Sequence, residues 1–297
     1  MDRRDFLKMM VAGAASMAIG WPETASPEPS AEVVAVRGGT PEVMFRRGIE
    51  ALGGMTNFVK PGQKVVVKPN IGWDRTPEEG ANTNPELVGE IVRQCREAGA
   101  SRVTVFDHTC NAAVACYKNS GIAEAARAAG ADVVYAERRP EYQEQRAEQA
   151  VIMKDALIFR AILEADVVIN VPILKNHGGA QMSAAMKNLM GIVWDRFSMH
   201  LRGLGQCIAD SLLYCRPTLN VVDAYRVMFQ NGPRGVSVHD VREMGYQLLS
   251  TDIVAVDVLA AKLLRLGVEQ LPMIGYAANM GLGVADESRI HITRLQA

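Results

Sequence analysis

Several features that would assign a protein to a class at once are scarce in this chain of 297 residues. Acidic and basic residues nearly balance to a formal net charge of −1, which gives neither a basic field for nucleic acid nor an acidic solvating tail. Low-complexity segments and repeats at solenoid spacing are lacking as well. What the chain has is a hydrophobic content of 48%, enough for one large α/β domain or two smaller ones.

Cysteine is sparse and its spacing is uninformative. The five cysteines form no C-x-x-C pair and no ferredoxin-like run, so we expect no iron–sulfur cluster on this chain. A bridge such as Cys110–Cys116 and a set of buried free thiols both remain open.

The first residues resemble a bacterial twin-arginine signal. Arg3 and Arg4 precede a Phe-Leu step, and an apolar run follows over residues 9–20, too short to span a bilayer, which takes about 20 residues. We therefore expect the twin-arginine export machinery as a partner, a periplasmic or other extracytoplasmic location, and no stable transmembrane segment after cleavage. The alternative is an amphipathic helix of a cytosolic protein. Because this route exports folded proteins, a cofactor loaded before export becomes more plausible.

The remainder alternates between strands and helices. Residues 1–30 are expected to be signal and linker, and residues 31–297 one domain, or two lobes at about 31–165 and 166–297. The pattern predicts an α/β fold with a mainly parallel sheet and helices on both faces. Strands are expected at 32–37, 64–68, 102–106, 132–135, 166–172, 218–222 and 289–295, and helices at 40–52, 84–98, 120–129, 154–164, 201–214 and 252–266.

Polar side chains follow four of these strands. In such sheets ligands bind beyond the carboxyl ends of the strands, so we expect these loops to form one rim. The first loop offers Lys68 and Asn70, the second Asp107, and the fourth Asp223 at the predicted end of its strand.

The third loop, residues 173–200, is the densest in chemically useful groups. Lys175 and His177 precede a Gly-Gly pair, and a helix is expected from Gln181. Lys187 could bind an anion or act as a base or covalent anchor, and a solvated lysine is the alternative. The resulting predictions are a catalytic Lys187; binding of a cofactor or small anion by Lys68, Asn70, Lys175 and Asn188; and a divalent transition metal on His177, His200, Asp223 and Asp107.

Seven short motifs, in their order along the chain, together resemble the bacterial and archaeal "domain of unknown function 362" family over roughly residues 33–283. The resemblance implies an α/β domain of undefined activity; some members carry a ferredoxin-type module, which this chain lacks. The motifs are Lys68-Pro69-Asn70, Asn82-Thr83-Asn84-Pro85, Lys175-x-His177, Met186-Lys187-Asn188-Leu189-x-Gly191, His200, Asp223 with Asn231-Gly232-Pro233, and Thr251-Asp252-x-x-Ala255-x-Asp257.

A fainter likeness concerns the Gly178-Gly179 pair followed by Lys187, Gly191 and His200. This series is similar to the cofactor-holding region of nickel-dependent lactate racemases, where a lysine carries a pincer nucleotide and histidines bind nickel. Three functions therefore stay open: an enzyme or cofactor protein, a non-catalytic periplasmic ligand-binding protein, and a maturation or accessory factor for a redox complex.

Overall fold

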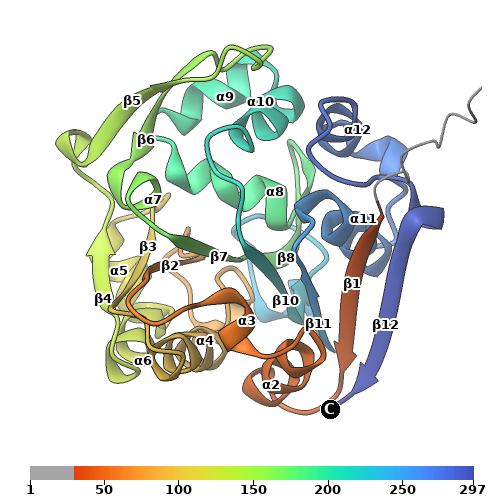
Figure 1. Ribbon diagram of the computed structural model, residues 1–297. Helices are drawn as coiled ribbons and strands as arrows, with labels where there is room; N and C mark the ends of the chain where they lie inside the picture. The colour runs from red at the N-terminus through yellow and green to blue at the C-terminus, as the bar shows by residue number, and fades with distance from the viewer. Residues whose placement is uncertain (1–29) are drawn as a thin grey trace, which may run out of the picture.

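The protein is built on one large sheet, as a computed structural model describing residues 30–297 shows (Figure 1). The predicted signal and linker, except for Ser30, lie outside these residues. Along the main path of the sheet the strand order is β12 (Ile290–Gln296), β1 (Ala31–Arg37), β11 (Val241–Ser250), β10 (Leu219–Met228), β7 (Val167–Val171), β2 (Lys64–Pro69), β3 (Arg102–Asp107) and β4 (Asp132–Tyr135).

Most neighbouring strands in this sheet are parallel. The run β10-β7-β2-β3-β4 is parallel throughout, and β11 is antiparallel to both of its neighbours. A short antiparallel extension, β8 (Ile173–His177) with β9 (Gln181–Ser183), joins the sheet beside β10. The two lobes considered from the sequence share this one sheet, because β1 lies between β11 and β12.

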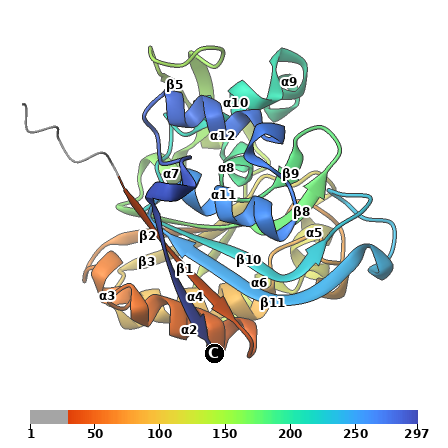
Figure 2. The same cartoon turned by 90° about the vertical axis from the view of Figure 1, so that its right-hand side faces the viewer.

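Helices cover both faces of the sheet, which confirms the predicted fold class (Figure 2). Each face has its own apolar core. One face carries α2 (Pro41–Ala51), α3 (Met55–Phe58), α4 (Pro85–Glu97), α5 (Ala113–Asn119) and α6 (Ile122–Ala128); the other carries α7 (Arg160–Leu163), α8 (Ala185–Asn188), α9 (Arg196–Arg202), α10 (Leu204–Ser211), α11 (Ile253–Leu263) and α12 (Pro272–Asn279).

The helix starts follow the sequence signals closely. The Asn84 side chain accepts a hydrogen bond from the backbone N–H of Leu87, and Asp252 accepts two from the first turn of α11. These bonds satisfy donors that a helix leaves unpaired at its N-terminus. Thr40 occupies the N-cap position of α2 but its side chain makes no capping bond, so Pro41 at the first helical position marks this start instead.

Three local predictions were wrong. Residues 155–159 form strand β6, which pairs with β5 (Tyr142–Arg146), because cross-strand hydrogen bonds outweigh the local helical pattern. Residues 181–183 form β9 instead of a helix, since they pair with β8. Strand β10 does not end before Asp223 but runs on to Met228, because β11 continues to pair with it.

Two further features bear on location and redox state. In the part of the chain that the structure covers, no helix has the length and hydrophobicity needed to cross a membrane. All five cysteines are free thiols, four of them buried and Cys110 exposed, so the structure selects free thiols over the Cys110–Cys116 bridge.

Candidate functional site

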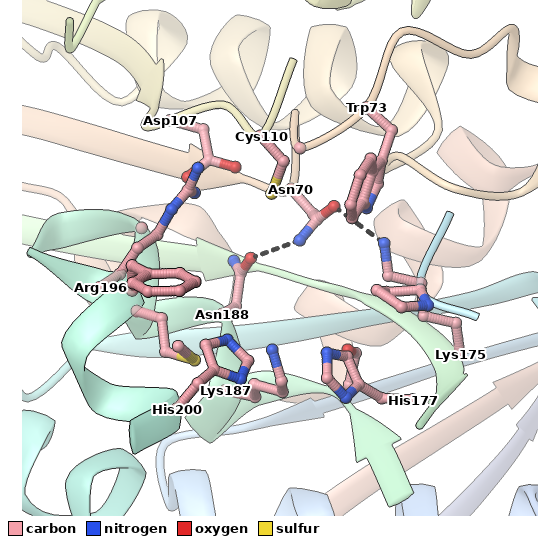
Figure 3. Close-up of a pocket in the computed structure, with 16 residues that line it drawn as sticks. Asn70, Trp73, Asp107, Cys110, Lys175, His177, Lys187, Asn188, Arg196 and His200 are labelled. Carbon is pink, nitrogen blue, oxygen red and sulfur yellow. Dashed lines mark hydrogen bonds between the residues drawn. The ribbon is translucent and has the colours of Figure 1, made fainter. Parts of the chain in front are cut away.

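A cavity of about 440 Å³ opens where the carboxyl ends of β2 and β3 meet the β8–β9 hairpin and the segment that follows it (Figure 3). This volume is in the range of small-molecule sites. Its walls are formed by Asn70, Gly72, Trp73, Asp107, Cys110, Lys175, His177, Ser183, Lys187, Asn188, Met190, Gly191, Arg196, Phe197, His200 and Pro233.

Seven of the nine residues selected from the sequence line this cavity. Lys68 lies beneath the lining, because it bonds to both Asp107 and Asn188. Asp223 is elsewhere: its carboxylate accepts hydrogen bonds from the backbone N–H groups of Asn84 and Tyr225. Asp223 therefore helps to hold the start of α4 and is not brought to the cavity.

The floor of the cavity is a buried ion pair. The Lys68 ammonium lies 2.7 Å from Asp107 Oδ1, and both side chains are almost wholly excluded from solvent. Asp107 also accepts hydrogen bonds from the backbone N–H groups of Ile71 and His108. Burial lowers the pKa of Lys68, although the Asp107 charge opposes this shift. The one carboxylate in the lining is thus already committed to a cation.

Two asparagines connect this floor to the cavity wall. Asn188 accepts from Lys68 and from the Asn70 amide through Oδ1, and its own amide donates to the Lys68 carbonyl. Asn70 Oδ1 in turn accepts from the Lys175 ammonium at 3.2 Å. Lys175 also donates to the Ala81 carbonyl at 2.5 Å. The chain of bonds fixes the end of Lys175 against one side of the cavity.

Lys175 and Lys187 bring positive charge to the cavity, and neither forms an ion pair with a carboxylate of residues 30–297. Lys175 is 1% exposed and Lys187 is partly buried. Burial lowers the pKa of Lys175 to about 7, and the charge of Lys187 contributes. Burial likewise lowers the pKa of Lys187 to about 8, with Arg196 acting in the same direction. An anion in the cavity would relieve this mutual repulsion.

His177 faces the cavity as a hydrogen-bond donor. Its Nδ1 accepts the backbone N–H groups of Gly179 and Ala180, each at 3.0 Å. Because Nδ1 holds a lone pair, the neutral ring carries its proton on Nε2. Burial, followed by the charges of Lys187 and His200, lowers the pKa of His177 to about 3, which keeps the ring neutral. The His200 ring stacks on it with centroids 6.1 Å apart.

These contacts bear on the predicted metal ligands. A metal needs an unprotonated ring nitrogen, and the free nitrogen of His177 carries the proton. Asp107 is paired with Lys68, and Asp223 does not line the cavity. Within residues 30–297, no three His, Cys, Asp or Glu side chains are grouped to hold a metal ion. The structure does not bring the four predicted ligands together.

The position of Lys187 is set by the residues around it on α8. The buried Asp257 carboxylate accepts from the backbone N–H groups of Ala185 at 2.7 Å and Met186 at 3.0 Å. Burial raises the pKa of Asp257 to about 7, and these two donors oppose the shift. Met186 and Asn188, on either side of Lys187, are both buried. Asp257 therefore anchors the segment that carries Lys187.

Sequence reasoning did not select several side chains of the cavity. Arg196 donates to the carbonyls of His108 and Thr109, which holds its guanidinium at the cavity edge. Its place directly after the helix-capping Asp195 gave no hint of this role. Trp73 and Phe197 provide aromatic surface, and Cys110 an exposed thiol. All four stood in loops already expected at the rim, Arg196 and Phe197 within residues 173–200, but none of them was selected as a site residue.

The fold and the cavity define a class: an α/β protein with a cation-lined site at the carboxyl ends of parallel strands. Residues 65–262 match the family described as "Domain of unknown function (DUF362)". This match spans more than half of the chain, so the protein belongs to that family.

Two known proteins are similar to this chain. It is 28% identical over 248 residues to "Thylakoid-associated protein sll1697" of Synechocystis sp. (strain ATCC 27184 / PCC 6803 / Kazusa), covering 80% of this chain and 74% of that protein. The solved structure of the lactate racemase apoprotein from Thermoanaerobacterium thermosaccharolyticum aligns with a TM-score of 0.44 at 13% identity. That alignment covers 72% of this chain and 53% of the racemase, so the chain spans about half of the solved protein's length.

Proposed function

We propose that this protein binds a small organic anion, a carboxylate or a phosphate, in the cavity beside Lys175 and Lys187. The observation that carries the proposal is the presence of two buried or partly buried lysines that form no ion pair with a carboxylate of residues 30–297. Uncompensated charge of this kind is costly to bury, so sites that keep it usually bind an opposite charge.

The remaining lining supports an organic ligand over an inorganic ion. His177 presents an N–H donor, and Arg196 adds a third cation near the opening. Trp73, Met190 and Phe197 offer apolar surface on which a carbon skeleton can pack. Charge-assisted hydrogen bonds from the cations would supply most of the affinity, and the apolar wall would supply selectivity.

The first test is binding of lactate, pyruvate and phosphate, followed by calorimetry and by the rise in melting temperature. We expect Lys187→Met to weaken binding about 10- to 100-fold, the range given by the loss of a charge-assisted hydrogen bond. Lys118→Met, which removes an exposed lysine on α5, is the matched control and should bind as the parent does. Equal affinity of the Lys187 variant and the parent for all three anions would contradict the proposal.

Binding should also weaken as pH rises. Lys175 and Lys187 have pKa values of about 7 and 8, so both are mainly charged at pH 6.5 and mainly neutral at pH 9. An anion loses its partners over that interval. Calorimetry at the two pH values measures the effect, and affinity that is constant or increases toward pH 9 would contradict it.

Export is the second part of the proposal. It is supported by the Arg3-Arg4 motif and by a relative whose name describes it as thylakoid-associated. Arg3→Lys combined with Arg4→Lys should leave the protein inside a bacterium that has the twin-arginine route, as fractionation would show. Arg46→Lys with Arg47→Lys, a second arginine pair in α2, is the matched control and should still be exported. Normal periplasmic recovery of the first variant would refute the signal.

The predicted divalent metal stays a prediction. Metal analysis of the exported, purified protein tests it independently of the anion proposal, because the two lysines do not depend on a metal for their charge.

A further inference from the structure

The two lysines of the cavity differ in what holds them. Lys175 donates to Asn70 and to the Ala81 carbonyl, so its ammonium is fixed in the wall with one N–H left over. Lys187 Nζ has no hydrogen-bond partner among residues 30–297. Figure 3 shows its side chain between the His177 and His200 rings. One lysine is fixed in the wall by hydrogen bonds, and the other ends in a nitrogen without a hydrogen-bond partner.

The surroundings of Lys187 favour a reactive amine over an ion-paired one. Asp107, the carboxylate in the lining, is bonded to Lys68. Burial and Arg196 lower the pKa of Lys187 to about 8, so roughly a tenth of it is the neutral amine near pH 7. A desolvated lysine beside a second cation is a recognised way to obtain an amine nucleophile at neutral pH.

Hydrogen bonds hold in place the backbone from which the Lys187 side chain extends. Asp257 bonds to the first two N–H groups of α8, and Asn188 is tied to Asn170 and to the carbonyl of Lys68. Such support keeps the reacting atom within a small volume, as covalent catalysis requires.

We propose that Lys187 forms an imine with the carbonyl carbon of a 2-oxo carboxylate whose carboxylate group is bound by Lys175. This inference rests on the anion site proposed above, because the carboxylate of the oxo acid must be the anion held there. The ligand class follows from the pairing of a fixed cation with a free amine in one small cavity. Compounds in which a carbonyl is adjacent to a carboxylate match that pairing.

The chemistry balances without any further reactant. The neutral Lys187 nitrogen attacks C2, forming a C–N bond as the carbonyl π electrons move to oxygen. That oxygen takes up a proton and the nitrogen releases one, giving a carbinolamine. The nitrogen lone pair then expels the hydroxyl group, which takes up a proton from solvent and leaves as water. The resulting iminium nitrogen returns one proton to solvent, so Lys175 stays charged against the carboxylate. The sum is amine plus ketone giving imine plus water. The His177 Nε2–H can donate a hydrogen bond to the carbonyl oxygen while negative charge develops on that oxygen.

The test is reductive trapping of the full-length chain with pyruvate and cyanoborohydride, read by intact mass and by peptide mapping. We expect a single reduced adduct per chain, located on Lys187, and at least a tenfold loss of trapping in Lys187→Met. Lys118→Met should be trapped as the parent is. The rate should be highest between pH 7 and pH 8 and fall on either side, because the reaction needs the neutral form of Lys187, with a pKa of about 8, and the charged form of Lys175, with a pKa of about 7. Adducts spread over exposed lysines, or undiminished trapping in the Lys187 variant, would overturn the proposal.

Lactate separates this inference from the anion site on which it rests. Lactate has nearly the shape of pyruvate but a hydroxyl in place of the carbonyl, so it can bind and cannot form an imine. If lactate binds and pyruvate is not trapped, the imine is refuted and the anion site stands. If lactate, pyruvate and phosphate all fail to bind, the anion site itself fails, and the imine with it.

Discussion

Asp107→Ala is expected to lower the free energy of unfolding by about 3–5 kcal/mol, because it leaves the Lys68 ammonium buried without its partner. Lys68 is wholly excluded from solvent, and Asp107 is its nearest acceptor at 2.7 Å. Two backbone N–H groups, of Ile71 and His108, lose their acceptor in the same change. Urea unfolding monitored by circular dichroism measures the loss.

A second ion pair provides the control. Arg102, on the same strand as Asp107, pairs with Asp132 at 2.8 Å, but both side chains are more than half exposed. Asp132→Ala should therefore cost less than about 1 kcal/mol. Comparable losses in the two variants would mean that burial of the Lys68–Asp107 pair does not decide its contribution.

The pH dependence identifies the cause. In the Asp107 variant, the pKa of Lys68 in the folded protein should fall further below its value in the unfolded chain. The unfolded state then binds more protons than the folded state, so stability rises with pH above the folded-state pKa. The difference between parent and variant should shrink at high pH, where the buried amine becomes neutral. A constant difference across pH would point to lost packing instead of lost charge.

Features of the fold and site that depend on interactions between residues close in sequence could be predicted, and features that depend on distant residues could not. Asn84 and Asp252 cap their helices through bonds to residues at most three positions further along the chain, so the local sequence indicated both helix starts. The parallel sheet followed from alternating strands and helices. The β8–β9 and β5–β6 pairings join segments whose local pattern does not specify them, and a prediction by periodicity treats them as loop or helix.

The same distinction applies to the site. Lys175, Lys187 and the two histidines were selected because they follow a core strand closely in sequence, and they do line one cavity. Asp223 was misplaced because its strand was expected to end there, whereas pairing with β11 carries the strand onward. Arg196 was missed because its position depends on the carbonyls of His108 and Thr109, residues remote in the sequence.

Gly191→Ala is expected to destabilise the protein by about 3 kcal/mol and to impair anion binding, because an added methyl group has no room. A Cβ at this position would lie 2.0 Å from Asp107 Oδ1 and 2.7 Å from Lys68 Nζ. Overpacking a buried site usually costs about 1–3 kcal/mol. The upper end applies here, since the two groups that must move form the buried ion pair.

The matched control is Gly178→Ala. An ideal Cβ on Gly178 meets nothing within 4 Å, although the residue follows His177 directly. Stability and anion affinity should both stay close to those of the parent, which separates loss of space from loss of a glycine as such. Urea unfolding and calorimetry with lactate measure the two effects.

The Gly191 variant also tests how the floor and the wall of the cavity are connected. Displacing Lys68 disturbs its bond to Asn188, and Asn188 bonds through Asn70 to Lys175. The affinity for lactate, which must reach Lys175, should therefore fall in Gly191→Ala. It should stay at the parent value in Lys118→Met, because Lys118 contacts none of these groups. If the variant is destabilised but binds lactate as the parent does, the asparagine connection does not position Lys175.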